Sequence, residues 1–149
     1  MTRIRTITER DRAAWARLRD ALWPGSRADH NAETRHYFEM SAPTMVVFVA
    51  EAADRLVGFL ELDFRKYAPG CRSSPVPFLE GWYVEPARQR QGIGRALVAA
   101  AEAYARAAGH VEIASDTEVE NTASIAAHAA LGFEEAERVV SFRKALVWR

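Results

Sequence analysis

The fold is decided by the stretch Tyr83-Val-Glu-Pro-Ala-Arg-Gln-Arg-Gln-Gly-Ile-Gly-Arg-Ala-Leu97, which joins a predicted strand to a predicted helix. Its centre, Gln89 to Gly94, has the pattern Gln-x-x-Gly-x-Gly. Two glycines at a helix start leave backbone N–H groups accessible, and the helix dipole adds positive potential there. Together with the charges of Arg90 and Arg95, these groups predict a binding site for phosphate oxygens. The loop does not match the Rossmann pattern Gly-x-Gly-x-x-Gly, because Leu97 occupies the third glycine position. It does not match the Walker A loop either, because Gly-Lys-Ser/Thr is absent.

Hydrophobic periodicity predicts the elements on both sides of this stretch. A helix capped by Thr8 and ended by Pro24 follows the first strand. Their order, β-α-α-β-β-β-α-β-α-β, predicts an α+β fold with three α/β/α layers around a mixed, mostly antiparallel sheet. The other helices are predicted over Asn31–Met40, Gly92–Ala108 and Asn121–Leu131, and the strands over Arg3–Ile7, Met45–Glu51, Arg55–Phe64, Phe78–Val84, Val111–Ser115 and Glu137–Leu146.

Length and composition exclude several classes of protein. The 149 residues suit one domain, residues 1–149. Twenty basic and 20 acidic side chains give no net charge, which weighs against a nucleic-acid-binding protein. The single cysteine, Cys71, excludes an internal disulfide and suggests a reducing compartment. No apolar stretch approaches the ~20 residues that span a membrane, the start lacks the apolar core of a signal peptide, and the four histidines lack metal-ligand spacing. We expect a cytoplasmic protein that binds no membrane and no metal.

Charge is unevenly distributed along the chain. Seven acidic side chains and no Lys or Arg lie between Val111 and Glu137, whereas Arg88, Arg90 and Arg95 cluster just before this segment. Because a well-mixed surface is the ordinary arrangement, this separation suggests two ligands of opposite charge.

Two motifs together resemble the GNAT acyltransferase superfamily. The first is Gln89–Gly94, which in that superfamily binds the pyrophosphate of acetyl-CoA. The second is Asn121-Thr-Ala-Ser124 followed by Ala130-Leu-Gly-Phe133. The resemblance narrows to the aminoglycoside 6'-N-acetyltransferases through further segments: Leu22–Gly25, Ser73–Val76, Phe78–Gly81, Ala114–Thr117 and Glu134–Lys144. It implies direct acetyl transfer from acetyl-CoA to the 6'-amine of an aminoglycoside antibiotic in a ternary complex, and hence resistance to that drug.

The resemblance also implies a fold in which two central strands splay apart. The strand before the loop then offers a free backbone N–H to the thioester oxygen, and this donor belongs to Val84 or its neighbour Tyr83. Alternatively, both are ordinary strand residues. Further cofactor contacts are implied for Gln89, Arg90, Gln91, Gly92, Ile93, Gly94 and Arg95, and for Asn121 and Ser124, of which Asn121 is also a good helix N-cap.

Two side chains are candidates for proton transfer. Glu80 lies among apolar neighbours, where burial favours a general base, but it can equally anchor a cationic acceptor or form an ordinary salt bridge. His128 stands where many GNAT enzymes carry a tyrosine that protonates the leaving thiolate. It can equally be a helix residue that packs near Phe133.

Acidic and aromatic side chains are candidates for binding the acceptor. The resemblance places Trp23, Tyr67, Glu80, Asp116 and Glu137 in this role, with the rings against sugars or ammonium groups. For Trp23, burial in the core at a helix end is the competing interpretation.

Other interpretations remain open at this stage. The acceptor can be another polycation or a protein amine, or the chain can be a non-catalytic acyl-CoA-binding module. The last strand is expected at a sheet edge, which proteins usually cover, so we expect a homodimer that involves it. An acetyl-cysteine route through Cys71 is disfavoured because no His or Asp motif lies near it.

Overall fold

A computed structural model describes residues 1–147 of the chain. It consists of two compact units, Met1–Asp116 and the residues from Thr117 onward. The single domain over residues 1–149 stays a prediction.

A five-stranded sheet forms the centre of the first unit. Its strands, β1 (Thr2–Thr6), β2 (Val46–Ala52), β3 (Arg55–Arg65), β4 (Val76–Val84) and β5 (Ala114–Ser115), lie side by side in sequence order. The first four are antiparallel, and β5 joins β4 in parallel. This confirms the predicted mixed, mostly antiparallel sheet.

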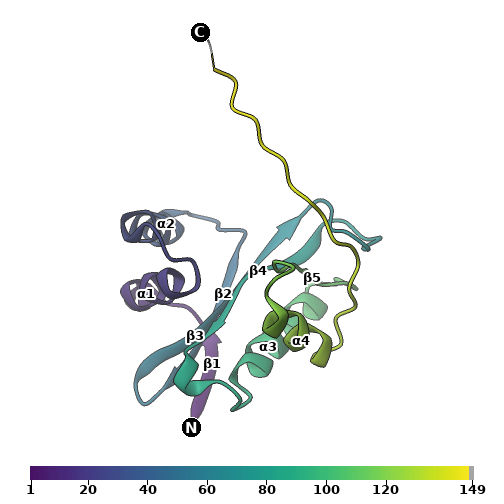
Figure 1. The fold of residues 1–149 in the computed structure, drawn as a ribbon. Helices are drawn as coiled ribbons and strands as arrows, with labels where there is room; N and C mark the ends of the chain where they lie inside the picture. The colour runs from purple at the N-terminus through teal and green to yellow at the C-terminus, as the bar shows by residue number, and fades with distance from the viewer. Residues whose placement is uncertain (148–149) are drawn as a thin grey trace. The chain divides into compact units, whose positions relative to one another are not determined.

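Helices cover both faces of this sheet (Figure 1). Helices α1 (Arg12–Leu22) and α2 (Arg27–Glu39) lie on one face, and α3 (Ile93–Ala107) lies on the other. Short 3₁₀ turns at Glu9–Asp11 and Pro86–Arg88 precede α1 and α3. The three predicted layers are therefore present.

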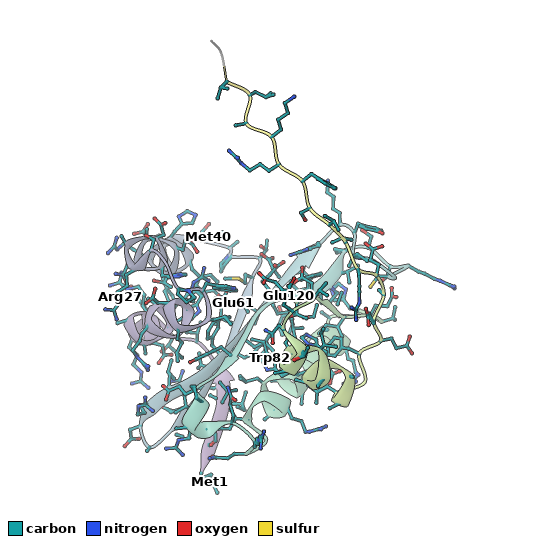
Figure 2. The ribbon with its side chains drawn as sticks, viewed as in Figure 1. Met1, Arg27, Met40, Glu61, Trp82 and Glu120 are labelled. Atoms are coloured by element: carbon teal, nitrogen blue, oxygen red, sulfur yellow. The ribbon has the colours of Figure 1, made fainter. Side chains whose placement is uncertain are left out.

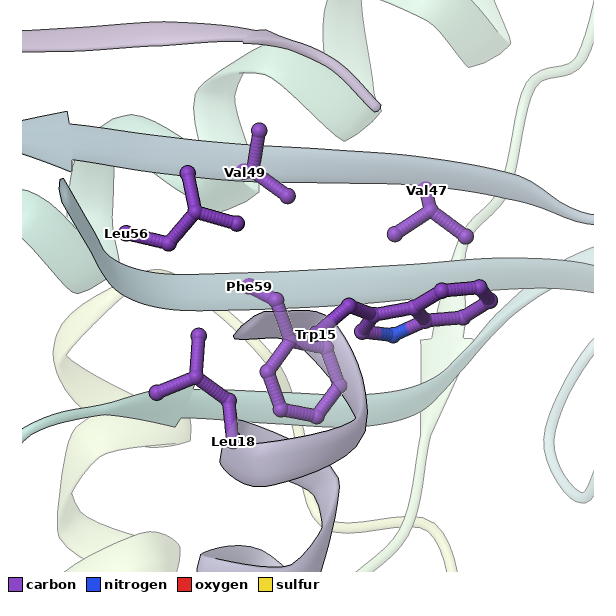
Figure 3. Packing of buried hydrophobic residues seen from close by; sticks show 6 residues of the cluster. All are labelled: Trp15, Leu18, Val47, Val49, Leu56 and Phe59. Atoms are coloured by element: carbon purple, nitrogen blue, oxygen red, sulfur yellow. The ribbon is translucent and has the colours of Figure 1, made fainter. Parts of the chain in front are cut away.

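The main hydrophobic core fixes α1 on the sheet, as Figure 3 shows. Trp15 and Leu18 of α1 pack against Val47, Val49 and Phe59, all at most 1% exposed. The apolar residues of α1 recur at helical spacing, so burying this stripe determines which face of the helix meets the sheet.

Local polar signals set where the first two helices begin. Asp11 accepts hydrogen bonds from the N–H and hydroxyl of Thr8 at 2.8 and 3.0 Å. Thr8 is the N-cap of the 3₁₀ turn Glu9–Asp11, and Asp11, three residues after the predicted cap, is the N-cap of α1. Helix α2 begins at Arg27, four residues before the predicted start. The Ser26 hydroxyl accepts a hydrogen bond from Asp29 N–H at 3.1 Å, an N-cap that the prediction missed.

Strand β4 contains a β-bulge at Glu80. Glu61 of β3 pairs with Gly81, but the next β3 residue, Leu62, pairs with Leu79, so Glu80 is the extra residue. Strand β5 pairs with β4 only through Ala114 and Ser115, instead of from the predicted Val111 onward, and this contact ends at Leu79. The β4 edge that faces β5 therefore leaves the ladder at the bulge, in agreement with the expected splay.

The second unit contains helix α4 (Thr122–Ala130), whose N-cap is Asn121. The strand predicted over Glu137–Leu146 is wrong for this structure, because residues 133–147 contain neither helix nor strand. Its apolar side chains Val139, Val140, Phe142 and Leu146 are 66–93% exposed. A strand needs a neighbouring strand to bond its backbone, and within residues 1–147 this segment has none.

Among residues 1–147, the structure has no helix long and apolar enough to cross a membrane.

We predict that Asp11→Asn lowers the free energy of unfolding by about 2 kcal/mol at neutral pH. The Arg5 guanidinium donates to both carboxylate oxygens of Asp11 at 2.7 and 2.9 Å, and this holds the pKa of that carboxyl at about 2, below its usual 3.8. The stabilisation is therefore complete above pH ~4 and disappears as the pH falls towards 2. Urea unfolding across this range should show the stability curves of variant and parent converging in acid, whereas the exposed Asp54→Asn control should track the parent. A pH-independent gap would contradict the prediction.

Candidate functional site

The loop before α3 presents backbone donors to solvent. Gly92 is the N-cap of α3 and adopts the left-handed conformation at φ 81°, as does Arg90 at φ 63°. A Cβ at Gly92 would meet no atom within 4 Å, so the glycine serves its backbone conformation rather than close packing. The first N–H groups of a helix lack intrahelical acceptors and lie at the positive end of the helix dipole. The exposed turn has the chemistry of an anion site.

The second loop glycine has a different role, which is to pack against an aromatic ring. A Cβ at Gly94 would lie 3.3 Å from the Trp82 indole, and the Trp82 Nε1–H donates to the Gly94 carbonyl at 3.1 Å. Trp82 projects from β4, as labelled in Figure 2. The first turn of α3 is thus fixed directly to the strand that carries Glu80.

Backbone geometry distinguishes Val84 from Tyr83 as the candidate oxyanion donor. Glu85 N–H donates to the Val57 carbonyl at 2.8 Å, in register with the antiparallel pairing of β3 and β4. Along such a strand, successive N–H groups point alternately towards and away from the neighbour. Tyr83 therefore directs its N–H into the β3 ladder, whereas Val84 directs its own N–H to the opposite edge. The carbonyl of Val84 faces the same edge, where the Gln89 side chain donates to it at 3.1 Å.

Glu80 is bound by an internal cation. Arg65, at the end of β3, donates to both carboxylate oxygens of Glu80 at 2.7 and 2.8 Å. The guanidinium carbon also lies 3.5 Å from the centroid of the Phe78 ring. The salt bridge that sequence analysis left open for Glu80 is therefore present, although Arg65 itself was not predicted.

Asp116 and Tyr67 are exposed at the ends of strands. Asp116 follows β5 directly, as predicted, and contributes with Glu80 and Asp63 to the negative potential at Arg65. Tyr67 lies in the loop after β3 and is 69% exposed.

Trp23 lies beside the bulge. A Cβ on Gly81 would come within 2.6 Å of the Trp23 ring, so the indole lies directly over this glycine, one residue from Glu80. Trp23 is 37% exposed and also makes an edge contact with Phe59. It is thus neither fully buried nor free, and its exposed part can contact a ligand.

A buried polar network holds Trp23 in place. Glu61, 3% exposed, accepts hydrogen bonds from Trp15 Nε1–H at 2.9 Å and from Arg19 at 2.5 Å. Arg19 also pairs with Glu33, and its guanidinium lies 5.1 Å from the Trp23 ring centroid. Burial raises the pKa of Glu61, while the Arg19 charge and the hydrogen bonds from Arg19 and Trp15 oppose that rise. Glu61 is labelled in Figure 2.

His30 completes this network on α2. Its Nε2 lies 2.9 Å from the Trp23 carbonyl, and its Nδ1 lies 3.4 Å from Arg19 Nε. A carbonyl only accepts and Arg Nε–H only donates, so neutral His30 carries its proton on Nε2. The sequence signal for this network is one charge, Glu61, within the run Leu56–Leu62 of β3, whose other residues carry no charge.

In the second unit, Asn121 and Ser124 are connected through the start of α4. The Asn121 side-chain oxygen accepts the Ser124 N–H at 3.1 Å, which confirms the N-cap. His128 Nδ1 lies 2.7 Å from the Ser124 carbonyl, so it carries a proton there. In neutral His128 the other ring nitrogen is then unprotonated, and only the imidazolium form can donate a proton from Nε2. Its ring also contacts Phe133 edge-on, at 5.3 Å between centroids, which fits the packing alternative.

Among the seven segregated acids, Glu112 and Glu135 have hydrogen-bonded partners. Glu112 accepts hydrogen bonds from Arg72 N–H, Ser73 N–H and the Ser73 hydroxyl, and the Ser73 bonds lower its pKa. Glu135 pairs with Arg138. Glu137 lies exposed in the irregular segment after α4.

The Cys71 thiol is not indicated as a nucleophile. Burial, aided by the charge of Glu112, raises the pKa of the Cys71 thiol and disfavours a nucleophilic thiolate. Across residues 1–147, no group of three or more His, Cys, Asp or Glu side chains is arranged to hold a metal ion.

Residues 14–133 match the model of the acetyltransferase (GNAT) family. An aminoglycoside N(6')-acetyltransferase type 1 of Stenotrophomonas maltophilia is 50% identical, covering 96% of this chain and 93% of its own. The enzyme of the same name from Klebsiella aerogenes is 43% identical, covering 96% of both chains.

Solved structures show the same similarity. AAC(6')-Iy in complex with the bisubstrate analog CoA-S-monomethyl-acetylneamine superposes with a TM-score of 0.89 at 38% identity, covering 98% of this chain and 99% of that one. AAC(6')-IG from Acinetobacter haemolyticus gives a TM-score of 0.87 at 35% identity, covering 97% and 99%.

We predict that Gly81→Ala costs about 1–3 kcal/mol of unfolding free energy, because the new methyl group would displace the Trp23 ring. In a Trp23→Ala background the same change should cost less, since the contacts with the indole are gone and only the Phe59 ring, at 3.3 Å, stays close. A double-mutant cycle by urea unfolding measures this coupling. Equal costs in both backgrounds would show that the ring and the glycine are not in contact.

Proposed function

The chain belongs to the GNAT acetyltransferase family, and on this basis we propose that it transfers the acetyl group of acetyl-CoA to the 6'-amine of aminoglycoside antibiotics and so confers resistance to them. The observation that carries this proposal is 43–50% identity, over 96% of the chain, to enzymes with that activity in their name.

The start of α3 suits the diphosphate of acetyl-CoA. Its exposed first-turn N–H groups and the left-handed Gly92 provide a backbone cradle for anionic oxygens, and Arg90 and Arg95 add charge. Bound there, acetyl-CoA supplies an activated thioester. By family resemblance, Gln89, Gln91, Ile93 and Gly94 also contact it, and Asn121 and Ser124 contact the pantetheine arm.

Transfer needs a donor for the thioester oxygen, a neutral attacking amine and a proton for the departing thiolate. The outward N–H of Val84 stabilises the negative charge that develops on the oxygen as the C–N bond forms and the C–S bond breaks. Tyr83, whose N–H is directed into the β3 ladder, contributes at most its side chain. His128 in its imidazolium form is the candidate acid.

Carboxylates and aromatic rings bind the polycationic acceptor. Trp23 and Tyr67 offer partly exposed ring surface, and Glu80, Asp116 and Glu137 offer negative charge. Because Glu80 is paired with Arg65, we assign it first to binding an ammonium group and second to accepting a proton.

The primary test measures CoA thiol release by purified protein with acetyl-CoA and tobramycin. We expect turnover and a mono-acetylated product, and no turnover with an analogue that carries a hydroxyl at 6'. Turnover with other polyamines alone would redirect the acceptor assignment. Thermal stabilisation by CoA without turnover on any amine would indicate a non-catalytic binding module instead.

A mutation of Glu80 distinguishes its two proposed roles, which are binding an ammonium group and accepting a proton. Glu80→Gln should raise the KM for tobramycin roughly tenfold, the equivalent of about 1.4 kcal/mol, with a smaller effect on kcat. A base role would instead lower kcat and shift its pH profile. If the variant matches the parent in both parameters, Glu80 has neither role.

We also propose a cytoplasmic homodimer that binds no nucleic acid. The single cysteine suits a reducing compartment, and the equal counts of acidic and basic side chains argue against nucleic acid. Support for the dimer comes from the exposed segment Val139–Val147, where apolar side chains lack cover.

The dimer predicts a change in mass when that segment is altered. Val140→Asp combined with Phe142→Asp should convert a dimer to a monomer in light scattering, whereas Arg106→Asp on the exposed face of α3 should leave the mass unchanged. A monomeric parent protein at all concentrations would contradict the proposal.

A further inference from the structure

We propose that Arg65 is an internal counter-ion that competes with the acceptor's ammonium groups for Glu80, and that this competition sets which amines the enzyme accepts. The inference rests on the proposed function, because it assumes a cationic acceptor at this carboxylate.

Arg65 binds Glu80 in the way that an ammonium group of the acceptor would. Arg65 Nε and Nη2 each bond one Glu80 oxygen, at 2.8 and 2.7 Å. Because both carboxylate oxygens are engaged, an acceptor ammonium must either share them or displace the guanidinium. The bulge makes the site of competition accessible, since Glu80 is the unpaired residue of β4.

Arg65 also has other interactions available when it releases Glu80. Its guanidinium lies over the Phe78 ring, 3.5 Å from the centroid, and lies in the fields of Asp116 and Asp63. One guanidinium is therefore bound to Glu80 and acted on electrostatically by two further carboxylates, and this net negative charge attracts additional cations. An acceptor with several ammonium groups can place one of them on Glu80 in place of Arg65 and the others in the surrounding negative potential. An acceptor with a single amine gains only the first of these interactions, so it displaces Arg65 less readily.

The exchange is energetically modest. The Arg65 and Glu80 side chains are 43% and 28% exposed, and ion pairs open to solvent contribute little to stability. Release of the internal partner should therefore change acceptor affinity by a few-fold, enough to shift selectivity without preventing binding.

The chain contains a matched control pair. Arg55, at the start of β3, binds Glu85, the residue after β4, with 2.8–3.0 Å contacts, and its side chain is 50% exposed. Glu85 also pairs with Arg17 at 3.2 Å, so it keeps a cationic partner when Arg55 is replaced. Arg55 lies at the opposite end of these strands, ten residues along β3 from Arg65. Removing it perturbs a similar cross-strand ion pair without changing the charge beside Glu80.

The test compares Arg65→Gln, Arg65→Lys and Arg55→Gln with the parent. Arg65→Gln should lower the KM for tobramycin about two- to fivefold, and by a larger factor for an acceptor with fewer amines. The KM for acetyl-CoA and kcat should change by less than twofold. Arg65→Lys should stay near the parent because the charge remains, and Arg55→Gln should match the parent throughout.

Titration calorimetry of tobramycin without acetyl-CoA gives a second readout that does not depend on turnover. Tighter binding by Arg65→Gln supports the inference even if the parent acetylates nothing, in which case only the proposed function fails. A rise in KM or weaker binding would mean that Arg65 positions Glu80 instead of competing for it. Unchanged values, or no binding by either protein, would also overturn the inference.

Discussion

One buried carboxylate, Glu61, anchors the network that holds Trp23, a candidate acceptor-binding residue of the first unit. It is 3% exposed and is neutralised by Arg19 and hydrogen-bonded by Trp15. Removing one partner of such a pair typically costs about 3–5 kcal/mol, because the other charge stays buried. Through Arg19 and His30 the same network connects α1 and α2 to β3 and sets the Trp23 ring. The orientation of this aromatic surface therefore depends on the core.

A second constraint comes from the sheet. Strand β4 gains Glu80 as an extra residue at the point where β5 stops pairing with it. Because these two features coincide, one backbone edge of β4 is free, and the Val84 N–H lies on that edge. The bulge also interrupts the regular alternation of side chains along β4 at Glu80. Two residues after Glu80, the Trp82 side chain donates a hydrogen bond to the first turn of α3. One strand thus connects the candidate anion-binding turn to the candidate acceptor residues.

Much of this architecture could be predicted from sequence because it depends on local patterns. The helical spacing of Trp15 and Leu18, the Gln89–Gly94 loop and the Asn121 cap each carry their signal within a few residues. The start of α2 was missed because the Ser26 cap is a weaker local signal than the apolar residues further on. Partners distant in sequence could not be predicted: Arg65 and Glu80 meet only through strand register, and Arg19 and Glu61 only through packing. The last strand failed for a related reason, since apolar alternation indicates strand propensity but does not supply a neighbour.

The bond between Trp82 and Gly94 has a practical consequence for anyone working with this molecule. Indole emission depends on the polarity and rigidity around the ring, and this ring is attached to the turn proposed to hold the diphosphate. The chain therefore has an intrinsic optical reporter at the proposed donor site, and Trp23 is a second one beside the proposed acceptor residues. The chain contains four tryptophans, so replacing one of these two with phenylalanine removes only that ring's contribution. The difference from the parent spectrum then reports occupancy at that position without an added label.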